Sequence, residues 1–444
     1  MTNQPNQANR PAGAPRIKGW CPGAWRPMAS GDGLLVRVRP PLGRLTRHQI
    51  LALCEAAETF GSGLIELTNR ANLQLRGVSD ASWPGLMAFL VEHGLVAADP
   101  QEERRLPLLL APDWQPGDAT HEVARRLEAR LDALPALPAK MGVAIDAGAA
   151  PLLGEVSADF RIERSRERGL EGGLPARASG ALPAQSSGAL LVRADGREKG
   201  TPVDSPAAAV ELLIRLLHWF VDSGGIDAGR MRRHPAPLPP WAPATQRPAA
   251  AGPVPTLGQH AWGRVLGLPF GRAPAATLRA LIAAESVVAA SASSDSVGAV
   301  RVTPWRRLLV EGFPVGAPSP PGLLESESDP RLAMQACPGA PYCEQASVAT
   351  LGLAQELAER LDGQVAGSMH LSGCVKGCAC QAPTDLCLTG REGRFDLIVG
   401  GRADGTPAAT GLTESDVIAL ISRDREDERR GQGVARVFCH RRQK

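Results

Sequence analysis

The sequence has few lysines, no long apolar run and no excess of charge of either sign. Five lysines stand among 49 basic residues, which face 46 acidic ones, so the formal net charge is only +3. The two signs are interspersed, which disfavours the one-sided basic surface of a nucleic-acid groove. No apolar run approaches the roughly 20 residues of a membrane span, and residues 1–16 lack the apolar centre of a signal peptide. We therefore expect a cytoplasmic protein whose partners are neither membranes nor nucleic acids.

A disulfide framework is also not expected. In a reducing compartment, closely spaced members of the nine cysteines point instead to metal binding or redox chemistry. The chain has 444 residues, and a prior of about 150 residues per unit gives two to four domains.

One strand–helix–strand pattern occurs twice. In the first copy, residues 31–78, an alternating segment precedes a helix that begins at a Thr46–Gln49 capping box and ends at Gly61. In the second copy, residues 265–312, LPFGR replaces RPPLGR and VTPWRRLLVEG replaces LTNRANLQLRGV. Two copies of one unit predict a pseudo-twofold arrangement with a ligand shared between the halves.

Two irregular segments separate the copies. Residues 172–189 are rich in glycine, alanine and serine, and they predict a flexible insertion. The segment 235–255 contains eight prolines and predicts a semi-rigid linker.

Four cysteines stand in two pairs near the end of the chain. ACPGAPYCEQA places Cys337 and Cys343 six positions apart, and SGCVKGCACQ places Cys374 and Cys378 four apart. Structural zinc usually takes more closely spaced pairs than the first of these, whereas an iron–sulfur cube spreads its ligands over a larger body. The spacing therefore favours a four-cysteine iron–sulfur cluster, with zinc and unrelated buried thiols as the alternatives.

The residues beside these cysteines support this interpretation. Gly339, Gly373 and Gly377 would allow backbone N–H groups to approach a cluster where a Cβ would obstruct them. Lys376 stands between the second pair and would offset the negative charge of a thiolate-ligated cluster; a solvated loop lysine is the alternative.

The remaining cysteines are weaker candidates for metal ligands. Cys380 is a rival to Cys378 as a ligand and ranks below it because its spacing is less usual. Cys387, in the alternating segment DLCLTG, and Cys54, at helical spacing, are expected in the core. Cys21 has no partner at metal spacing.

With these residues assembled, the chain resembles the sulfite and nitrite reductase superfamily over most of its length, from about residue 19 to 400. Within that superfamily, ACPGAPYC, SGCVKGCA and GREGRFDLIVGGRADG look most like the precorrin-3B synthase family. The resemblance implies an α+β fold with a duplicated unit related by a pseudo-twofold axis. It implies ferredoxin-like half-domains over 18–79 and 259–316, a reductase-like domain without a cluster over 80–225, a linker over 226–258 and a 4Fe-4S domain over 317–444.

The superfamily's functional residues carry over by their motifs. Cys337, Cys343, Cys374 and Cys378 match the cluster ligands. Arg70, Asn72 and Gln74, in LTNRANLQL, match the reductase motif Thr-x-Arg-x-x-x-Gln, and Lys140, in LPAKMG, matches the first lysine of Leu-Pro-Arg-Lys-Phe-Lys. Gly142 replaces the second lysine. A lost charged hydrogen bond costs about 1 to 3 kcal/mol, so sulfite reduction becomes less favoured.

Further arginines are candidates for binding a tetrapyrrole, whose acetate and propionate arms make it a polyanion. Guanidinium groups stay charged when desolvated and bind carboxylates bidentately. Arg70 and Arg306 are expected at matching places in the two copies, and Arg161 is a third candidate. Their alternative role is that of surface arginines at strand ends. Trp305 is expected in the core rather than over a macrocycle.

The resemblance also implies a reaction. In the precorrin-3B synthase family, precorrin-3A would lie where the reductases hold siroheme, and it is hydroxylated at C20 with molecular oxygen and closes a γ-lactone, in aerobic cobalamin biosynthesis. Closed-shell substrates react poorly with ground-state oxygen, so the cluster is expected to supply electrons from a donor such as NADH or a reductase. A further non-haem iron stays open, with His370 the nearest candidate ligand. No catalytic residue is assigned.

Three alternatives differ in testable ways. A siroheme-dependent sulfite or nitrite reductase would show strong red absorption bands. A non-catalytic electron carrier would not need the duplicated arginine-bearing unit. A zinc-stapled scaffold would contain zinc without iron.

Overall fold

The structure is a computed structural model that describes residues 21–103, 106–166, 189–286, 298–361 and 367–429. Nearly all of the insertion expected over residues 172–189 lies outside the described residues. No helix in the described part of the chain is both long and apolar enough to span a membrane.

The first half-domain is an antiparallel sheet with helices against one face. Its strands lie in the order β1 (Met28–Ser30), β2 (Gly33–Val38), β5 (Leu73–Val78), β4 (Leu64–Leu67) and β13 (Arg272–Pro274). Helix α1 (Arg47–Phe60) packs against α2 (Trp83–Glu92) and against this sheet. As predicted, α1 begins at the Thr46–Gln49 capping box, and Gly61 follows its last residue.

The second half-domain repeats this arrangement. Its strands lie in the order β11 (Gly258–His260), β12 (Gly263–Gly267), β15 (Arg307–Val310), β14 (Val300–Val302) and β3 (Arg44–Leu45), and its helix is α7 (Ala275–Ser286). Each sheet therefore contains one strand from the other copy: β13 completes the first sheet and β3 completes the second. The predicted duplication is confirmed, but the exchange of strands was not predicted.

In both copies, a matching turn carries the chain from one half-domain sheet to the other. The 3-10 turns η1 (Pro41–Gly43) and η4 (Pro269–Gly271) contain Leu42 and Phe270 with φ of 51° and 53°, and each ends in a glycine with positive φ. The segments PLGR and PFGR, which revealed the repeat, are these crossover turns.

Two further sheets share one topology. The strands of one are β6 (Leu108–Leu110), β7 (Val143–Asp146), β8 (Phe160–Arg164), β9 (Leu190–Ala194) and β10 (Thr201–Val203). Those of the other are β16 (Met334–Ala336), β17 (Met369–Ser372), β18 (Thr384–Arg391), β19 (Arg394–Gly401) and β20 (Ala409–Leu412). In each sheet, the first three strands are parallel to one another, and each of the last two strands pairs antiparallel with the strand before it.

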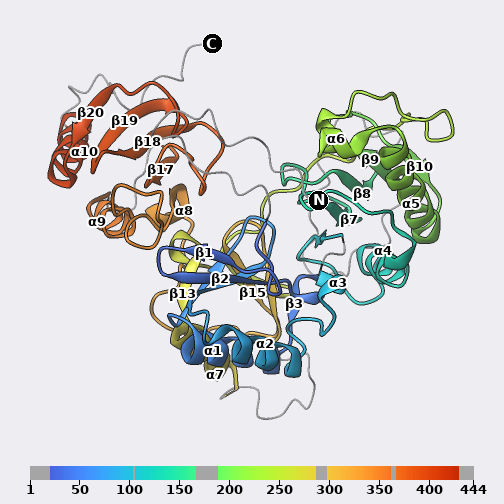
Figure 1. The fold of residues 1–444 in the computed structure, drawn as a ribbon, viewed down its shortest axis with the longest axis horizontal. Coiled ribbons are helices and arrows are strands. Elements are labelled where there is room, and N and C mark those ends of the chain that lie inside the picture. The colour runs from blue at the N-terminus through green and yellow to red at the C-terminus, as the bar shows by residue number, and fades with distance from the viewer. Residues whose placement is uncertain (1–20, 104–105, 167–188, 287–297, 362–366, 430–444) are drawn as a thin grey trace.

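Helices complete these two domains. The larger ones are α4 (Ala119–Glu128) and α5 (Pro206–Asp222) in the first, and α9 (Leu351–Leu361) and α10 (Glu414–Arg429) in the second. Short helices connect the elements: α3 (Pro100–Glu103), α6 (Gly225–Ala228) and α8 (Pro330–Ala333). Figure 1 shows the two domains on either side above the half-domains, whose helices α1, α2 and α7 form the lower layer.

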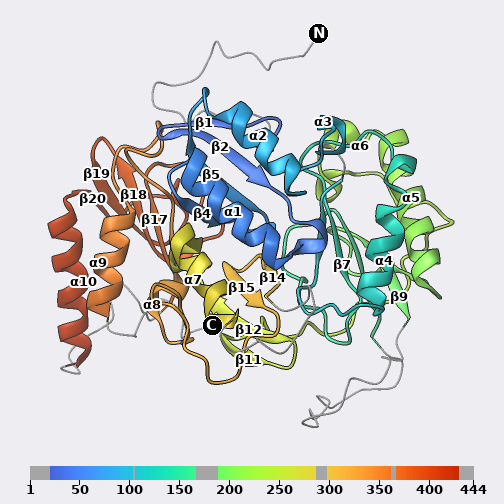
Figure 2. The same cartoon turned by 90° about the horizontal axis from the view of Figure 1, so that it is seen from below.

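The three largest hydrophobic cores follow this division into three bodies. The half-domains share one core, in which Ile50 and Leu53 of α1 join Val300 and Leu308 of the second copy. Each flanking domain has its own core. Figure 2, seen from below, shows α1 and α7 side by side in front of the half-domain sheets. The proline-rich segment pairs with the first flanking domain through bridges at Pro248 and Gln246.

Candidate functional site

The two cysteine pairs meet at one edge of the β16–β20 sheet. Cys337 follows β16 directly and Cys374 comes two residues after β17, and the carboxyl ends of parallel neighbours lie at the same edge. The Cys337 N–H donates to the Leu371 carbonyl at 3.1 Å, and Cys337 Sγ accepts from the Gly373 N–H at 3.1 Å. The topology thus joins two loops, the cysteine loops, over residues 337–343 and 374–378.

Electrostatic interactions link all four thiols. The pKa of Cys374 is raised by burial first, and also by the proximity of Cys337 and Cys343. The pKa of Cys378 is raised by desolvation first, and also by the proximity of Cys374, Cys337 and Cys343. Cys380 has other contacts: its Sγ donates to the Ala382 carbonyl at 3.4 Å, and it lies near Arg306 and Cys387.

The cysteine loops pack too closely for larger residues at two of the predicted glycines. A Cβ on Gly373 would lie 2.5 Å from the Ala346 Cβ, and one on Gly339 would lie 2.6 Å from Thr350 Oγ1. Gly339 and Gly377 also have φ of 67° and 59°, which favour glycine. A four-thiolate set in a glycine-lined cradle fits an iron–sulfur cluster. In the described part of the chain, no three His, Cys, Asp or Glu side chains are grouped closely enough to hold a single metal ion.

A row of polar side chains crosses the first half-domain sheet on the face opposite its buried valines. Arg37 on β2, Gln74 on β5, Glu66 on β4 and Arg272 on β13 lie in register. Arg37 Nη2 donates to Gln74 Oε1 at 2.8 Å, Gln74 Nε2 donates to Glu66 Oε2 at 3.3 Å, and Arg272 binds the same carboxylate. We call these four residues the polar row.

Three guanidinium groups gather at one end of the polar row. The pKa of Arg37 is lowered to about 10, by burial first and also by the proximity of Arg39 and Arg70. Arg39 Nη1 donates to the Glu103 carbonyl at 2.8 Å. Among the described residues, no carboxylate forms an ion pair with Arg37 or Arg70. This guanidinium cluster of Arg37, Arg39 and Arg70 is therefore suited to bind a ligand with several carboxylates.

The other end of the polar row reaches the cysteine loops. Arg272 interacts electrostatically with Cys337 and Tyr342. Arg76, on β5, donates from Nη2 to the Tyr342 carbonyl at 2.9 Å. One sheet face thus connects the guanidinium cluster with the four cysteines.

The sequence motifs point to Arg70 but not to Arg37 or Arg39. Their signal was the alternation in VRVRP, which places both arginines on the face opposite Val36 and Val38. Of the other predicted residues, Gln74 is part of the polar row, and Asn72 is buried beside it with its N–H donating to Thr68 Oγ1.

The predicted equivalence of Arg70 and Arg306 was wrong by one residue. Thr68 Oγ1 accepts from the Arg70 and Asn72 N–H groups, and Thr303 Oγ1 accepts from those of Trp305 and Arg307. Residue 70 therefore matches residue 305. The residues that follow, Ala71 and Arg306, both have positive φ, of 52° and 61°.

Arg306 and Arg161 bind backbone carbonyls within the protein. Arg306 donates to the Met334 and Leu332 carbonyls at 2.7 and 3.2 Å, and burial lowers its pKa to about 10. Arg161 is buried and donates to the carbonyls of Leu153, at 2.7 Å, and Val156. Arg161 thus holds a loop in place, and Arg306 holds the junction between α8 and β16.

The other predicted residues lie in varied surroundings. Lys140 is exposed, Lys376 is half-buried in its cysteine loop, and Trp305 packs against the half-domain core, as expected. His370 is fully buried beside Cys387, with 3.6 Å between Nδ1 and Sγ, and burial lowers its pKa to about 4. A neutral core histidine is therefore the better description.

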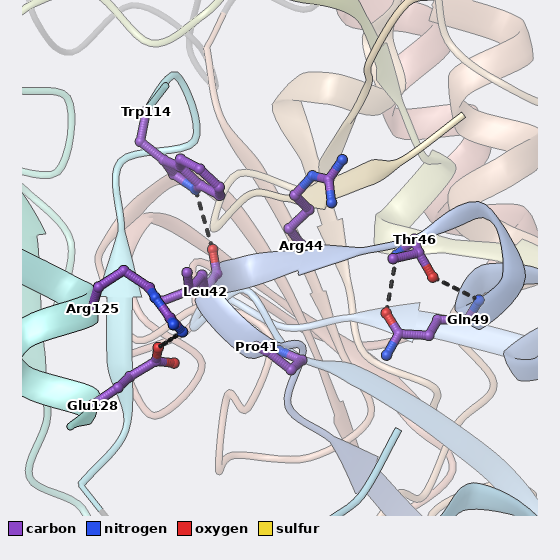
Figure 3. Close-up of a pocket in the computed structure, with 8 residues that line it drawn as sticks. All are labelled: Pro41, Leu42, Arg44, Thr46, Gln49, Trp114, Arg125 and Glu128. Atoms are coloured by element: carbon purple, nitrogen blue, oxygen red, sulfur yellow. Dashed lines mark hydrogen bonds and ion pairs between the residues drawn. The ribbon is translucent and has the colours of Figure 1, made fainter. Parts of the chain in front are cut away.

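A cavity of about 290 Å³ lies elsewhere, between η1 and α4. Figure 3 shows Arg125 paired with Glu128 and Trp114 Nε1 bonded to the Leu42 carbonyl beside it. Arg44, which also lines the cavity, is paired with Glu311 at 2.8 Å. Because both arginines already have carboxylate partners, this cavity is a poor site for a polyanion.

The matching face of the second sheet does not carry a polar row. Val265 and Leu309 occupy the places of Arg37 and Gln74. Buried Arg301 is paired with Glu311, donates to the carbonyls of Pro112 and Trp114, and stacks over the Trp114 ring at 4.2 Å. The first sheet is therefore the better candidate for the ligand-binding face.

Comparison with known proteins now identifies the family. Residues 26–93 match the nitrite/sulfite reductase ferredoxin-like half domain. A precorrin-3B synthase from Sinorhizobium sp is 34% identical over 418 residues, which cover 88% of this chain and 85% of the relative. The chain belongs to the precorrin-3B synthase family. The half-domain match includes α2 and so extends beyond the predicted boundary at residue 79.

More distant similarities agree with the precorrin-3B synthase fold described above. A ferredoxin–nitrite reductase from Synechococcus elongatus is 24% identical over 464 residues, which cover 90% of this chain and 87% of that protein. The solved structure of Mycobacterium tuberculosis NirA is 16% identical, with a TM-score of 0.53, and covers 90% of this chain and 82% of that one. The expected duplicated reductase-like fold is confirmed.

Proposed function

We propose that this chain hydroxylates precorrin-3A at C20 with molecular oxygen and closes the γ-lactone from the ring A acetate, in aerobic cobalamin biosynthesis. The observation that carries the proposal is a single sheet face, which holds the guanidinium cluster at one end and approaches the four cysteines at the other. A polycarboxylate substrate and a source of electrons would then lie next to each other.

The guanidinium cluster would bind the carboxylate arms of the substrate. Arg37, Arg39 and Arg70 present several N–H donors, and bidentate pairs with carboxylates would orient the macrocycle. Asn72 and Gln74 would hold the arginine-bearing strands in register, and Lys140 and Lys376 are further cations for the arms. Arg161 and Arg306 would act through the backbone segments that they fix. The partly buried setting would strengthen each ion pair relative to water.

Cys337, Cys343, Cys374 and Cys378 would hold a 4Fe-4S cluster. When bound, such a cluster supplies single electrons, which a closed-shell substrate and ground-state oxygen need in order to react. The electrons would come from a donor such as NADH or a reductase. Gly339 and Gly373 would keep the two loops in close contact around the cluster, and Lys376 would offset part of its negative charge.

The direct test is turnover by the reconstituted full-length chain. Precorrin-3A, a reductant and ¹⁸O₂ should yield a tetrapyrrole that has gained one labelled oxygen atom, measured by mass spectrometry. An unchanged tetrapyrrole mass in the presence of a redox-active cluster would contradict the proposal.

A siroheme-dependent nitrite reductase is the second candidate, favoured by the similarity to such enzymes. Gly142 replaces one of the cations that the reductase pattern provides for the oxyanion. A visible spectrum of the purified chain decides between the two, because siroheme adds strong red bands to the broad cluster absorption.

A further inference from the structure

The carbonyl oxygen of Tyr342 joins a cysteine loop to the first half-domain sheet. It accepts hydrogen bonds from Arg76 Nη2 at 2.9 Å, Ser30 Oγ at 2.7 Å and the Gly31 N–H at 3.2 Å. A carbonyl oxygen has two lone pairs, so three donors saturate it. Tyr342 immediately precedes Cys343. Donors from one domain therefore fix the backbone beside a cysteine of another.

Arg76 is itself held rigidly. Its side chain is only 5% exposed, and Nε and Nη2 each lie 2.8 Å from an oxygen of Asp32. Nη1 lies 3.5 Å from a carboxylate oxygen of Glu66. A planar guanidinium fixed by two carboxylates cannot shift without breaking charge-assisted hydrogen bonds.

The sheet and the loop also approach too closely for a side chain between them. A Cβ on Gly31, in the turn between β1 and β2, would collide with the Pro341 carbonyl. Cys337, at the other end of the same loop, is instead bound within its own domain by Leu371 and Gly373. The two cysteines of this loop are thus anchored to different domains.

We propose that Arg76 is a positioning residue that sets the location of Cys343 relative to the first half-domain sheet, through the Tyr342 carbonyl. The same sheet carries the guanidinium cluster, so Arg76 would fix the distance between bound substrate and the four-cysteine group. The catalytic part of this inference rests on the proposed function, whereas the contact between Arg76 and the Tyr342 carbonyl does not depend on it.

The first measurement needs neither substrate nor cluster. In the full-length chain without metal, Arg76→Met should raise the rate at which iodoacetamide alkylates Cys343 by about tenfold, the equivalent of about 1.4 kcal/mol. The rate at Cys337 should not change, and Arg76→Lys should restore part of the protection. Arg279→Met, which breaks an exposed ion pair with Glu58 on the helical side, is the matched control and should leave both rates unchanged.

The second measurement follows the reconstituted cluster by electron paramagnetic resonance. Arg76→Met should lower its midpoint potential, because the Asp32 and Glu66 carboxylates lose their cation, and Arg76→Lys should return it toward the wild-type value. If Arg76 has a purely structural role, the variant should bind less cluster, and the midpoint potential of the cluster that remains should not change.

An unchanged Cys343 rate in folded Arg76→Met overturns the inference. If that variant does not fold, Gly31→Ala serves instead, because its Cβ displaces the Pro341 carbonyl, and the absence of a selective Cys343 response there is equally decisive. A selective change in the Cys343 alkylation rate without hydroxylation of precorrin-3A would contradict the proposed function and would still support this inference. Hydroxylation of precorrin-3A without any change in the Cys343 rate would support the proposed function and overturn this inference.

Discussion

Arg37 and Arg70 of the first half-domain lie close together, and among the described residues neither forms an ion pair with a carboxylate. Removing one should weaken binding of a polyanion more than it weakens the fold. We expect Arg37→Met to raise the Kd for precorrin-3A by about 10- to 100-fold, since a charged hydrogen bond contributes about 1.5 to 3 kcal/mol. Anaerobic absorbance titration measures this. Arg232→Met, at a side chain 73% exposed, is the control, and equal effects of the two changes would count against the cluster as the binding site.

Two neighbouring cysteines give a matched pair for the metal site. Cys378 is coupled to the other three thiols, whereas Cys380 lies beside Arg306 and Cys387. Cys378→Ser should therefore lower iron and sulfide per chain and alter the cluster signal, and Cys380→Ser should retain both. Iron analysis and electron paramagnetic resonance check this, and the opposite ranking would assign the fourth ligand to Cys380.

Asp146, at the end of β7, is a buried carboxyl group that should give the fold a pH dependence. Its Oδ2 accepts from the Leu152 and Leu153 N–H groups at 2.6 and 2.7 Å. Burial raises its pKa to about 7, and the proximity of Asp113 and Glu163 also raises it. The folded state therefore disfavours the carboxylate, whereas the unfolded chain ionises at its ordinary lower pKa.

The sign of the effect follows from that difference. As pH rises from about 4 to 7, the unfolded chain loses the Asp146 proton first, so the free energy of unfolding should fall by up to about 1.4 kcal/mol per pH unit. Asp146→Asn should remove this slope. Urea unfolding at about pH 5 and pH 7 measures it, and equal slopes in the two proteins would show that other groups cause the dependence.

Local motifs explain which candidate site residues the sequence could reveal. Cysteine spacing and the LTNRANLQL motif are short-range signals, and they led to the four cysteines and to Arg70. The segment TPWRR holds two adjacent arginines, and nothing local shows that Arg306 adopts positive φ while Trp305 takes the place that matches Arg70. Burial of Arg161 against loop carbonyls depends on tertiary packing, which periodicity does not report.

Among elements, the two crossover turns have the same backbone in different surroundings. A Cβ on Gly43 would meet nothing closer than 3.9 Å, whereas one on Gly271 would lie 2.9 Å from the Arg306 Cδ. Gly43→Ala should cost about 1 to 2 kcal/mol for its positive φ alone. Gly271→Ala should cost more, because Arg306 must also move. Urea unfolding compares the two, and equal losses would mean that Arg306 adjusts freely.

Most elements of the half-domains were predictable, but their pairing was not. The capping box defined α1, and alternation defined β2. The pairing of β13 with β4 and of β3 with β14 joins segments more than 200 residues apart. No local pattern encodes such pairing, because it depends on which edges are brought together when the two copies pack.

For the whole molecule, the exchanged strands and the common half-domain core predict that the halves fold only together. Fragments 1–253 and 254–444, divided at an exposed site in the linker, should copurify when coexpressed. Each fragment alone should be aggregated, because it lacks one strand of its sheet and part of its core. Size-exclusion chromatography and circular dichroism measure both results. Two fragments that are separately folded and soluble would show that the exchange is dispensable.

The exchange also constrains the order of events on the ribosome. Strand β4 is made early, yet its edge partner β13 emerges only after about 200 further residues. Throughout that interval the nascent chain carries an open sheet edge, which is the feature that recruits chaperones or pairs with neighbouring chains. Slower initiation or lower temperature during recombinant expression should therefore raise the soluble yield more than it would for a protein whose sheets close in sequence order.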